Sequence, residues 1–331
     1  PQISSLMSTS NKPMKMPHPA PLSAATWQAI AQAHRVKAAA WTQPYRARRA
    51  AGDMHPSHDF LFIYFRFAPS ILENWHPGLG VGIEALKVPQ GFSEKHYTRE
   101  GNVLALDPSK LDDKTRKRLR WSLQLCNNIQ QRPPQFSCFG MHEWAMVYQG
   151  GPEGRPRHEG KLPLRLSQAE IDSVVERRPT CCSHFDAFRF FTDSAKPLNK
   201  IQPTQEARLD NEQPGCIHTN MDLYKWAAKC MPWIGSDLLW DCFEFAIRCR
   251  TIDMRASPYD CSSLGYKAIP IETEAGRTEY EHEQRNLTQA SQPLRARLIA
   301  TLENVLEPLH AHVAHLDATK AIDSSLQSSG S

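Results

Sequence analysis

Histidines and aspartates placed among large apolar side chains are the feature that most constrains how this chain can fold. Two runs between residues 180 and 226 carry them: Cys182-Ser183-His184-Phe185-Asp186, and Gly215-Cys216-Ile217-His218-Thr219-Asn220-Met221-Asp222. A polar side chain in apolar surroundings must find a hydrogen bond, an ion pair or a metal, because burying it without a partner costs free energy. We therefore predict a functional site around these residues.

Local patterns assign an element to each run. The alternating segment 182–191 predicts a strand, and the residues after Thr219 or Asn220, either of which is a favourable N-cap, predict a helix. Each element then brings a histidine to an aspartate. The predicted pairs are His184 with Asp186 on one strand face, and His218 with Asp222 one helical turn apart.

Length and composition indicate an ordinary globular protein. The chain has 331 residues, of which 40% are apolar and 22% are charged, and that is enough to bury one large core. Composition predicts a disordered leader over residues 1–22, a single catalytic domain over 23–316 and a disordered Ser-rich tail over 317–331. Helical periodicity is clear in several long segments, so the predicted fold class is α+β, helix-rich with a small sheet that carries the His184 segment.

Cysteine usage and charge limit the cellular setting and the partners. The nine cysteines show no regular C-x-x-C spacing, and the formal net charge is +4. This pattern argues against a disulfide framework or a zinc ribbon, so we predict a cytoplasmic protein whose cysteines fill the core, with no membrane partner. Nucleic acid is a compatible partner. Basic residues that could hold a nucleic-acid backbone, or form a solvated helix face instead, are Arg46, Arg48, Arg49, Arg116, Arg118 and Arg120.

Two further polar segments, His142-Glu143 and the run from Asp253 to Asp260, extend the candidate site. Together the candidate residues allow two kinds of chemistry, one with a metal and one without. Two histidines and a carboxylate are the ligand set of catalytic zinc or non-haem iron, which predicts a metal cofactor, Zn or Fe. The predicted metal ligands are His142, His184, His218 and Asp186. Without a metal, carboxylates act as general bases and an arginine binds the leaving group. The candidate catalytic residues are then Asp186, Asp222, Glu143 and Arg255.

Longer strings in the same regions resemble a known family. They are His55-Pro-x-x-Asp59-Phe-Leu-Phe, Arg66-Phe with Trp75-His76-Pro77-Gly78, Met141-His142-Glu143-Trp144-Ala145-Met146-Val147-Tyr148, Ser183-His184-Phe185-Asp186-Ala187-Phe188-Arg189-Phe190-Phe191, Pro214-Gly215-Cys216-Ile217-His218-x-Asn220-Met221-Asp222-Leu223-Tyr224-Lys225-Trp226 and Asp253-Met254-Arg255-Ala256-Ser257-Pro258-Tyr259-Asp260. Together they resemble a bacterial family labelled 3-methyladenine DNA glycosylase. The resemblance implies a hydrolase that excises an alkylated purine from DNA, with the flipped base held between aromatic side chains. Its implied substrate-binding residues are Trp144, Tyr148, Asn220, Tyr224, Asp253, Tyr259 and Asp260.

The leading hypothesis is therefore a DNA-repair hydrolase that cleaves the N-glycosidic bond of alkylated purines such as 3-methyladenine. The residues leave two alternatives open. One is a metal-dependent hydrolase or oxygenase that acts on a small molecule, and the other is a non-catalytic nucleic-acid-binding protein. The partner is accordingly either DNA or a small-molecule substrate.

Overall fold

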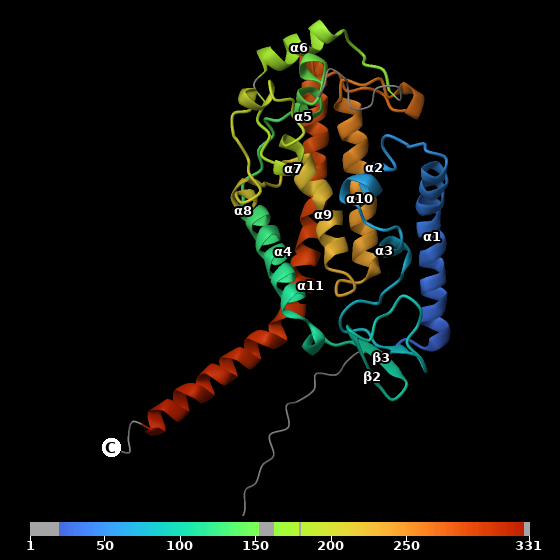
Figure 1. Ribbon diagram of the computed structural model, residues 1–331, viewed down its shortest axis with the longest axis vertical. Helices are drawn as coiled ribbons and strands as arrows, with labels where there is room; N and C mark the ends of the chain where they lie inside the picture. Colours follow the sequence, from blue (N-terminus) through green and yellow to red (C-terminus); the bar gives the residue numbers. More distant parts are fainter. Residues whose placement is uncertain (1–19, 152–161, 179, 328–331) are drawn as a thin grey trace, which may run out of the picture.

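Helices build almost all of this protein and pack around a central pair, with a small sheet at one end (Figure 1). The computed structural model describes residues 20–151, 162–178 and 180–327. The helices are α1 (Ala24–Ala50), α2 (Phe60–Phe65), α3 (Ser70–Glu73), α4 (Asp113–Gln131), α5 (Met141–Ala145), α6 (Gln168–Arg177), α7 (Phe185–Phe188), α8 (Arg208–Asn211), α9 (Ile217–Lys229), α10 (Ser236–Ala256) and α11 (Glu274–Gln327). The predicted helix-rich α+β fold class is confirmed.

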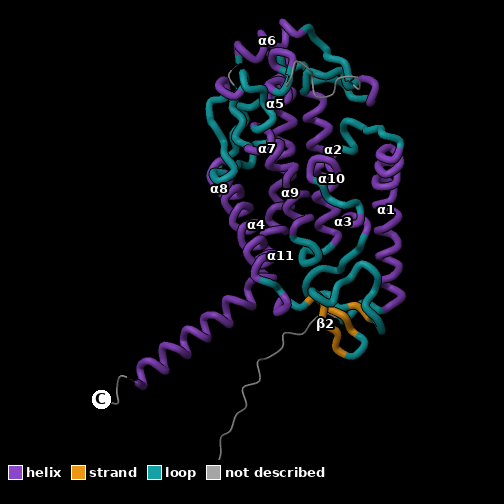
Figure 2. The backbone as a smooth tube through the Cα atoms, in the orientation of Figure 1, coloured by secondary structure: helices purple, strands orange, loops and turns teal. Residues whose placement is uncertain are grey.

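The sheet is antiparallel and lies away from the polar segments of the sequence (Figure 2). Its strands are β1 (Ile83–Glu84), β2 (Tyr97–Glu100) and β3 (Val103–Leu106), in the order β1-β3-β2. Tyr97 pairs with Leu106 and Glu100 with Val103 across the β2–β3 hairpin. The prediction that the sheet carries His184 is therefore wrong.

A helix cap replaces the strand that was predicted for residues 182–191. His184 is the N-cap of α7, and its Nδ1 accepts a hydrogen bond from the backbone N–H of Ala187 at 3.3 Å. Just before it, the backbone N–H of Cys182 donates to the side chain of Asn199 at 2.7 Å. Local side-chain bonds of this kind compete with strand pairing, and here they turn the chain into one helical turn.

Helix α9 is the centre of the bundle and has almost no exposed face. Every residue from Ile217 to Ala228 is buried, and α9 packs against α10 and α11, while α11 also packs along α4. The predicted N-cap at Thr219 or Asn220 is wrong, because the helix starts earlier with Cys216 as its N-cap. Gly215 permits this entry: a Cβ there would lie 2.4 Å from the carbonyl oxygen of Gln135, so only glycine fits.

Parts of the predicted leader and of the predicted tail lie outside the residues that the structure describes. Residues 1–19 of the predicted leader and 328–331 of the predicted tail lie outside the described residues. Helix α11 continues past residue 316 and ends at Gln327, so residues 317–327 of the predicted tail are helical. This end of α11 projects from the bundle (Figure 1). None of the described helices is long and apolar enough to cross a membrane.

Candidate functional site: a cationic cleft backed by two buried networks

Helix α9 carries polar side chains into the core, and their partners come from helices on two sides. On the first side, Nδ1 of His184 is already an acceptor, so Nε2 carries the proton and donates to Oδ2 of Asp222 at 3.1 Å. Lys225, one turn further along α9, donates to the same oxygen at 3.0 Å and to Oδ2 of Asp186 at 2.7 Å. One ammonium group thus joins a fully buried carboxylate to one at the surface.

Arg208 of α8 completes this first network. Its NH2 group donates to Oδ2 of Asp186 at 2.7 Å, and its Nε lies 3.2 Å from Oε1 of the buried Glu212. Burial opposes ionisation of Asp186, but Lys225 and Arg208 outweigh it and lower the pKa of this carboxyl group to about 2. Burial raises the pKa of Glu212. Asp186 therefore carries a negative charge at neutral pH.

The second network lies on the other side of α9, between α5 and α10. Nε2 of His142 is 2.6 Å from Oδ1 of Asp253, and Arg250 donates to Asp253 at 2.5 Å and to Glu143 at 2.8 Å. Burial disfavours charge on His142, but Asp253 outweighs this effect and raises the pKa of His142 well above its usual value. These four residues are at most 5% exposed, so the network lies in the core.

His218 stands between the two networks. Its ring centroid lies 4.3 Å from that of His142 and 5.5 Å from that of His184. Its Nδ1 is buried without a hydrogen-bond partner among the described residues. Burial and the neighbouring His142 lower the pKa of His218 well below its ordinary value. The three histidines from separate segments therefore do gather, as the sequence predicts.

The predicted metal ligands fall into two groups rather than one. The candidate ligand atoms of His142, His218 and Asp253 lie within 4.8 Å of one another, as do those of His184, Asp186 and Asp222. Every carboxylate in both groups already contacts a protein cation, either Arg250 or Lys225. A divalent ion would sit against that cation in a poorly screened interior, where repulsion is strong. We therefore interpret both groups as ion-pair networks.

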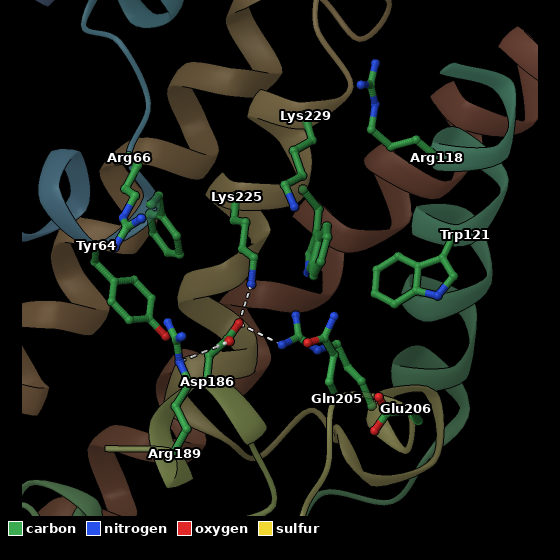
Figure 3. A pocket seen from close by; sticks show the side chains of 13 residues that line it. Tyr64, Arg66, Arg118, Trp121, Asp186, Arg189, Gln205, Glu206, Lys225 and Lys229 are labelled. Carbon is green, nitrogen blue, oxygen red and sulfur yellow. Dashed lines mark hydrogen bonds and ion pairs between the residues drawn. The ribbon is translucent and has the colours of Figure 1, made fainter. Parts of the chain in front are cut away.

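Asp186 marks the floor of an open cleft of about 690 Å³ (Figure 3). Six basic and four aromatic side chains line this cleft, together with Asp186, Glu206 and Gln205; the basic and aromatic ones are Arg66, Arg118, Arg189, Arg208, Lys225, Lys229, Tyr64, Phe65, Trp121 and Trp226. Trp121 of α4 faces Trp226 of α9 with ring centroids 5.0 Å apart. We call this site the cationic cleft.

Comparison with protein-family models, with curated proteins and with solved structures gives no match to this chain.

Two features of the cationic cleft indicate that it binds a ligand. Arg66, Arg118 and Lys229 form no ion pair with the part of the chain that the structure describes, so their charge is available at the rim. The hydroxyl of Tyr64 is buried and has no hydrogen-bond partner among the described residues. An orphaned buried donor in a cleft is uncommon in folded proteins, and a ligand atom is one way to satisfy it.

The aromatic and polar residues implied by the family resemblance lie elsewhere, in the core. Trp144 donates its indole N–H to the carbonyl of Ala256 at 2.9 Å, and Tyr148 donates to Glu176 at 3.0 Å. Four of the other implied residues are 1% exposed or less: Asn220, Tyr224, Asp253 and Tyr259. Asp222 of the candidate catalytic set is equally buried. Asp260 is half-buried, and its side chain caps a turn by accepting a hydrogen bond from the backbone N–H of Ser262. None of them lines the cleft, and the structure gives them packing or hydrogen-bonding roles behind it or elsewhere in the fold.

The predicted cations are divided in a similar way. Arg118 lines the cationic cleft, whereas Arg46 is paired with Glu73 and Arg48 with Asp59. Outside the cleft, Arg49 and Arg120 are exposed, Arg116 contacts Asp113, and Arg255 binds Glu279. The candidate catalytic Glu143 is held by Arg250 in the second network. Only Asp186 and Arg118 of the sequence-predicted sets reach the cleft.

Sequence reasoning missed most of the cleft, and one signal was available. Lys225 and Lys229 are four residues apart on α9 and flank Trp226, and their ammonium groups lie 4.6 and 4.9 Å from the Trp226 ring centroid. The other residues of α9 are apolar or have polar partners, so the two lysines indicate that this part of the helix faces an opening in the core. Tyr64 and Trp121 gave no such signal, because only tertiary packing brings α2 and α4 to α9.

Proposed function

We propose that this chain is a nucleic-acid enzyme that hydrolyses the N-glycosidic bond of an alkylated purine in the cationic cleft. The observation that carries the proposal is an ionised carboxylate, Asp186, at the floor of a cleft with aromatic walls and unpaired cations at its rim. The volume of the cleft is within the range of sites that enclose a small ligand. The sequence resemblance points to the same chemistry.

The rim supports binding of a phosphate backbone. Arg66 follows α2, Arg118 lies on α4 and Lys229 on α9, so the three cations come to the opening from separate elements (Figure 3). Cations in such an arrangement neutralise phosphates and release counterions. Arg66 ends α2 in a left-handed conformation, with φ 56° and ψ 32°, a backbone state that non-glycine residues adopt rarely and that often marks a functional position.

The walls and floor support recognition of an extruded base and cleavage of its bond. Tyr64, Phe65 and Trp121 are half-buried, so each leaves part of a ring exposed for stacking. Oδ2 of Asp186 receives both Lys225 and Arg208, whereas Oδ1 has, among the residues that the structure describes, only Arg189 at 3.5 Å. Oδ1 is therefore the oxygen available to stabilise positive charge on the sugar and to orient water.

An alkylated purine suits a carboxylate with a low pKa. A base that is alkylated on a ring nitrogen carries a positive charge, so it leaves without being protonated by the enzyme. The enzyme then has to stabilise charge that develops on the sugar, which an ionised carboxylate does without accepting a proton. Because Asp186 stays ionised down to a pH of about 2, this role does not require a pKa near neutrality.

The direct test is release of free base. Alkylated duplex and single-stranded DNA are incubated with the full chain, and the released bases are separated by chromatography. We expect 3-methyladenine to appear at a rate proportional to enzyme concentration. Salt-sensitive DNA binding without release of any base would overturn the enzymatic proposal and would favour a non-catalytic nucleic-acid-binding protein.

Charge reversal at the rim should weaken DNA binding. For Arg118→Glu and for Lys229→Glu, we expect each variant to lower affinity and to reduce the slope of log K against log salt by about one. The matched control is Arg120→Glu, which changes an exposed residue of the same helix α4 that does not line the cleft. Fluorescence anisotropy at four salt concentrations measures both quantities. If Arg120→Glu weakens binding as much as Arg118→Glu, the cleft is not the binding site.

A further inference from the structure

A second, much smaller pocket opens beside the second network, and the proposed function does not use it. It lies where the segments before α5, α7 and α9 meet α11, and its lining includes Cys138, Cys181, Cys182 and His142. Its free volume is about 10 Å³, which is close to what one water molecule needs. Gln284, which is 1% exposed, also lines the pocket, and its side-chain amide oxygen has no hydrogen-bond partner among the described residues.

Cys138 is the first member of a hydrogen-bonded chain of side chains. Its Sγ lies 3.7 Å from Nδ1 of His142, and Nε2 of the same ring lies 2.6 Å from Oδ1 of Asp253. Arg250 holds the other oxygen of Asp253 at 2.5 Å. A thiol, an imidazole and a carboxylate in this order form the arrangement that activates a cysteine, because the imidazole takes the thiol proton and the carboxylate stabilises the imidazolium.

A second thiol lies next to the first. Cys182 lines the same small pocket, and its S–H donates to the carbonyl oxygen of His184 at 3.6 Å. The neighbouring Cys182 and the contact with His142 lower the pKa of Cys138 well below its ordinary value, against the effect of burial. Cys138 is half-buried as a residue and lines the small pocket.

We propose that Cys138 is a reactive thiol that small hydroperoxides oxidise and that Cys182 resolves as a disulfide. A pocket with room for about one water molecule excludes bulky electrophiles, and hydrogen peroxide, with two oxygen atoms, is the smallest hydroperoxide. The contact with the imidazole of His142 favours the thiolate form of Cys138, which is the form that reacts. The pocket is separate from the cationic cleft, so this proposal stands independently of the glycosylase proposal.

The chemistry balances in two steps. First, the Cys138 thiolate attacks one peroxide oxygen; the S–O bond forms, the O–O bond breaks, and the leaving oxygen takes the proton held by His142 to give water. Sulfur loses two electrons and becomes a sulfenic acid. Second, the sulfur of Cys182 attacks the sulfenic sulfur; the S–S bond forms, the S–O bond breaks, and the hydroxyl leaves as water with the Cys182 proton.

The experiment treats the reduced full chain with one equivalent of hydrogen peroxide. Free thiols are then blocked by alkylation, and the digested protein is analysed by mass spectrometry without reduction. We expect a Cys138–Cys182 linked peptide in the wild type and none in Cys138→Ser. In Cys182→Ser, we expect a sulfenic acid at Cys138 that a dimedone probe traps. Cys181→Ser, which removes a half-buried thiol from the same pocket, should leave the linked peptide unchanged.

A comparison within one molecule guards against variants that fail to fold. In wild-type protein, Cys138 and Cys181 are both half-buried, but only Cys138 contacts His142. We expect Cys138 to be oxidised at least about tenfold faster than Cys181. Equal rates at the two thiols, or a disulfide that links Cys181 instead of Cys182, would overturn the proposal.

Discussion

Replacing Asp186 with asparagine is expected to lower kcat/KM for base release by about 100-fold to 1,000-fold. Asparagine keeps the shape of the side chain but removes the negative charge that faces the cationic cleft. Because the rim cations are unchanged, affinity for DNA should stay the same or increase. Single-turnover rates with alkylated DNA measure the chemical step, and anisotropy measures binding on the same samples.

The control for this variant is Asp193→Asn. Asp193 follows α7 closely in sequence and forms an ion pair with Lys196, but its side chain is 97% exposed. We expect no change in base release. A thermal unfolding curve for each variant shows whether the fold is intact. If Asp186→Asn protein is folded and releases base at the wild-type rate, Asp186 has no catalytic role.

The pH dependence of base release follows from the same network. Lys225 and Arg208 hold the pKa of Asp186 at about 2, below its ordinary value of 3.8. A lowered pKa keeps the carboxylate ionised as pH falls, so Asp186 should cause no loss of rate between pH 7 and about pH 4. The ion pairs that lower this pKa also stabilise the fold, and that contribution disappears only as pH falls towards the folded-state pKa.

Replacing Arg250 with methionine is expected to lower the free energy of unfolding by about 3–5 kcal/mol. Methionine fills a similar volume but leaves Asp253 and Glu143 buried without their shared cation. The guanidinium group of Arg250 is also centred 3.9 Å from the Phe60 ring, and this contact is lost as well. Urea unfolding followed by circular dichroism measures the change.

Two further variants separate the buried charges from general packing. Arg297→Met removes an ion pair with Asp241 in which both side chains are about half exposed, and we expect a loss below about 1 kcal/mol. The triple variant Glu143→Gln, Arg250→Met, Asp253→Asn removes all three charges together, so it should recover part of the stability that Arg250→Met loses. If Arg250→Met costs no more than Arg297→Met, the network does not contribute to stability as argued.

Much of the fold was accessible from sequence because it depends on local signals. Ser167 and Glu170 have the spacing of a capping box, and they form one at the start of α6 with reciprocal side-chain to backbone bonds. Asp112 caps α4 through the backbone N–H of Thr115 at 2.6 Å. The assignment of residues 182–191 as a strand was wrong because the His184 side chain caps a helical turn, and alternation of side chains does not reveal such a cap.

The candidate site was only partly accessible, for a different physical reason. Polar residues in apolar runs correctly identified His142, His184 and His218 as neighbours. Their division into two networks is set by Arg250 and Lys225, long side chains whose reach across helices cannot be read from spacing. The cationic cleft was missed because its walls come from α2, α4 and α9, which are far apart in the chain.

The sequence order of the residues that surround α9 affects how the protein folds during synthesis on the ribosome. Glu143 and His184 come before α9 in the sequence, whereas Arg250 and Asp253 follow it by more than 20 residues. Residues of the networks on the two sides of α9 are therefore synthesised at different times. Contacts between residues so distant in sequence form slowly, because a long loop must close first. In a nascent chain that ends just after α9, the first network has all its members, whereas His142 and Glu143 still lack Asp253 and Arg250. The domain becomes a folding unit only once α10 and α11 have left the exit tunnel.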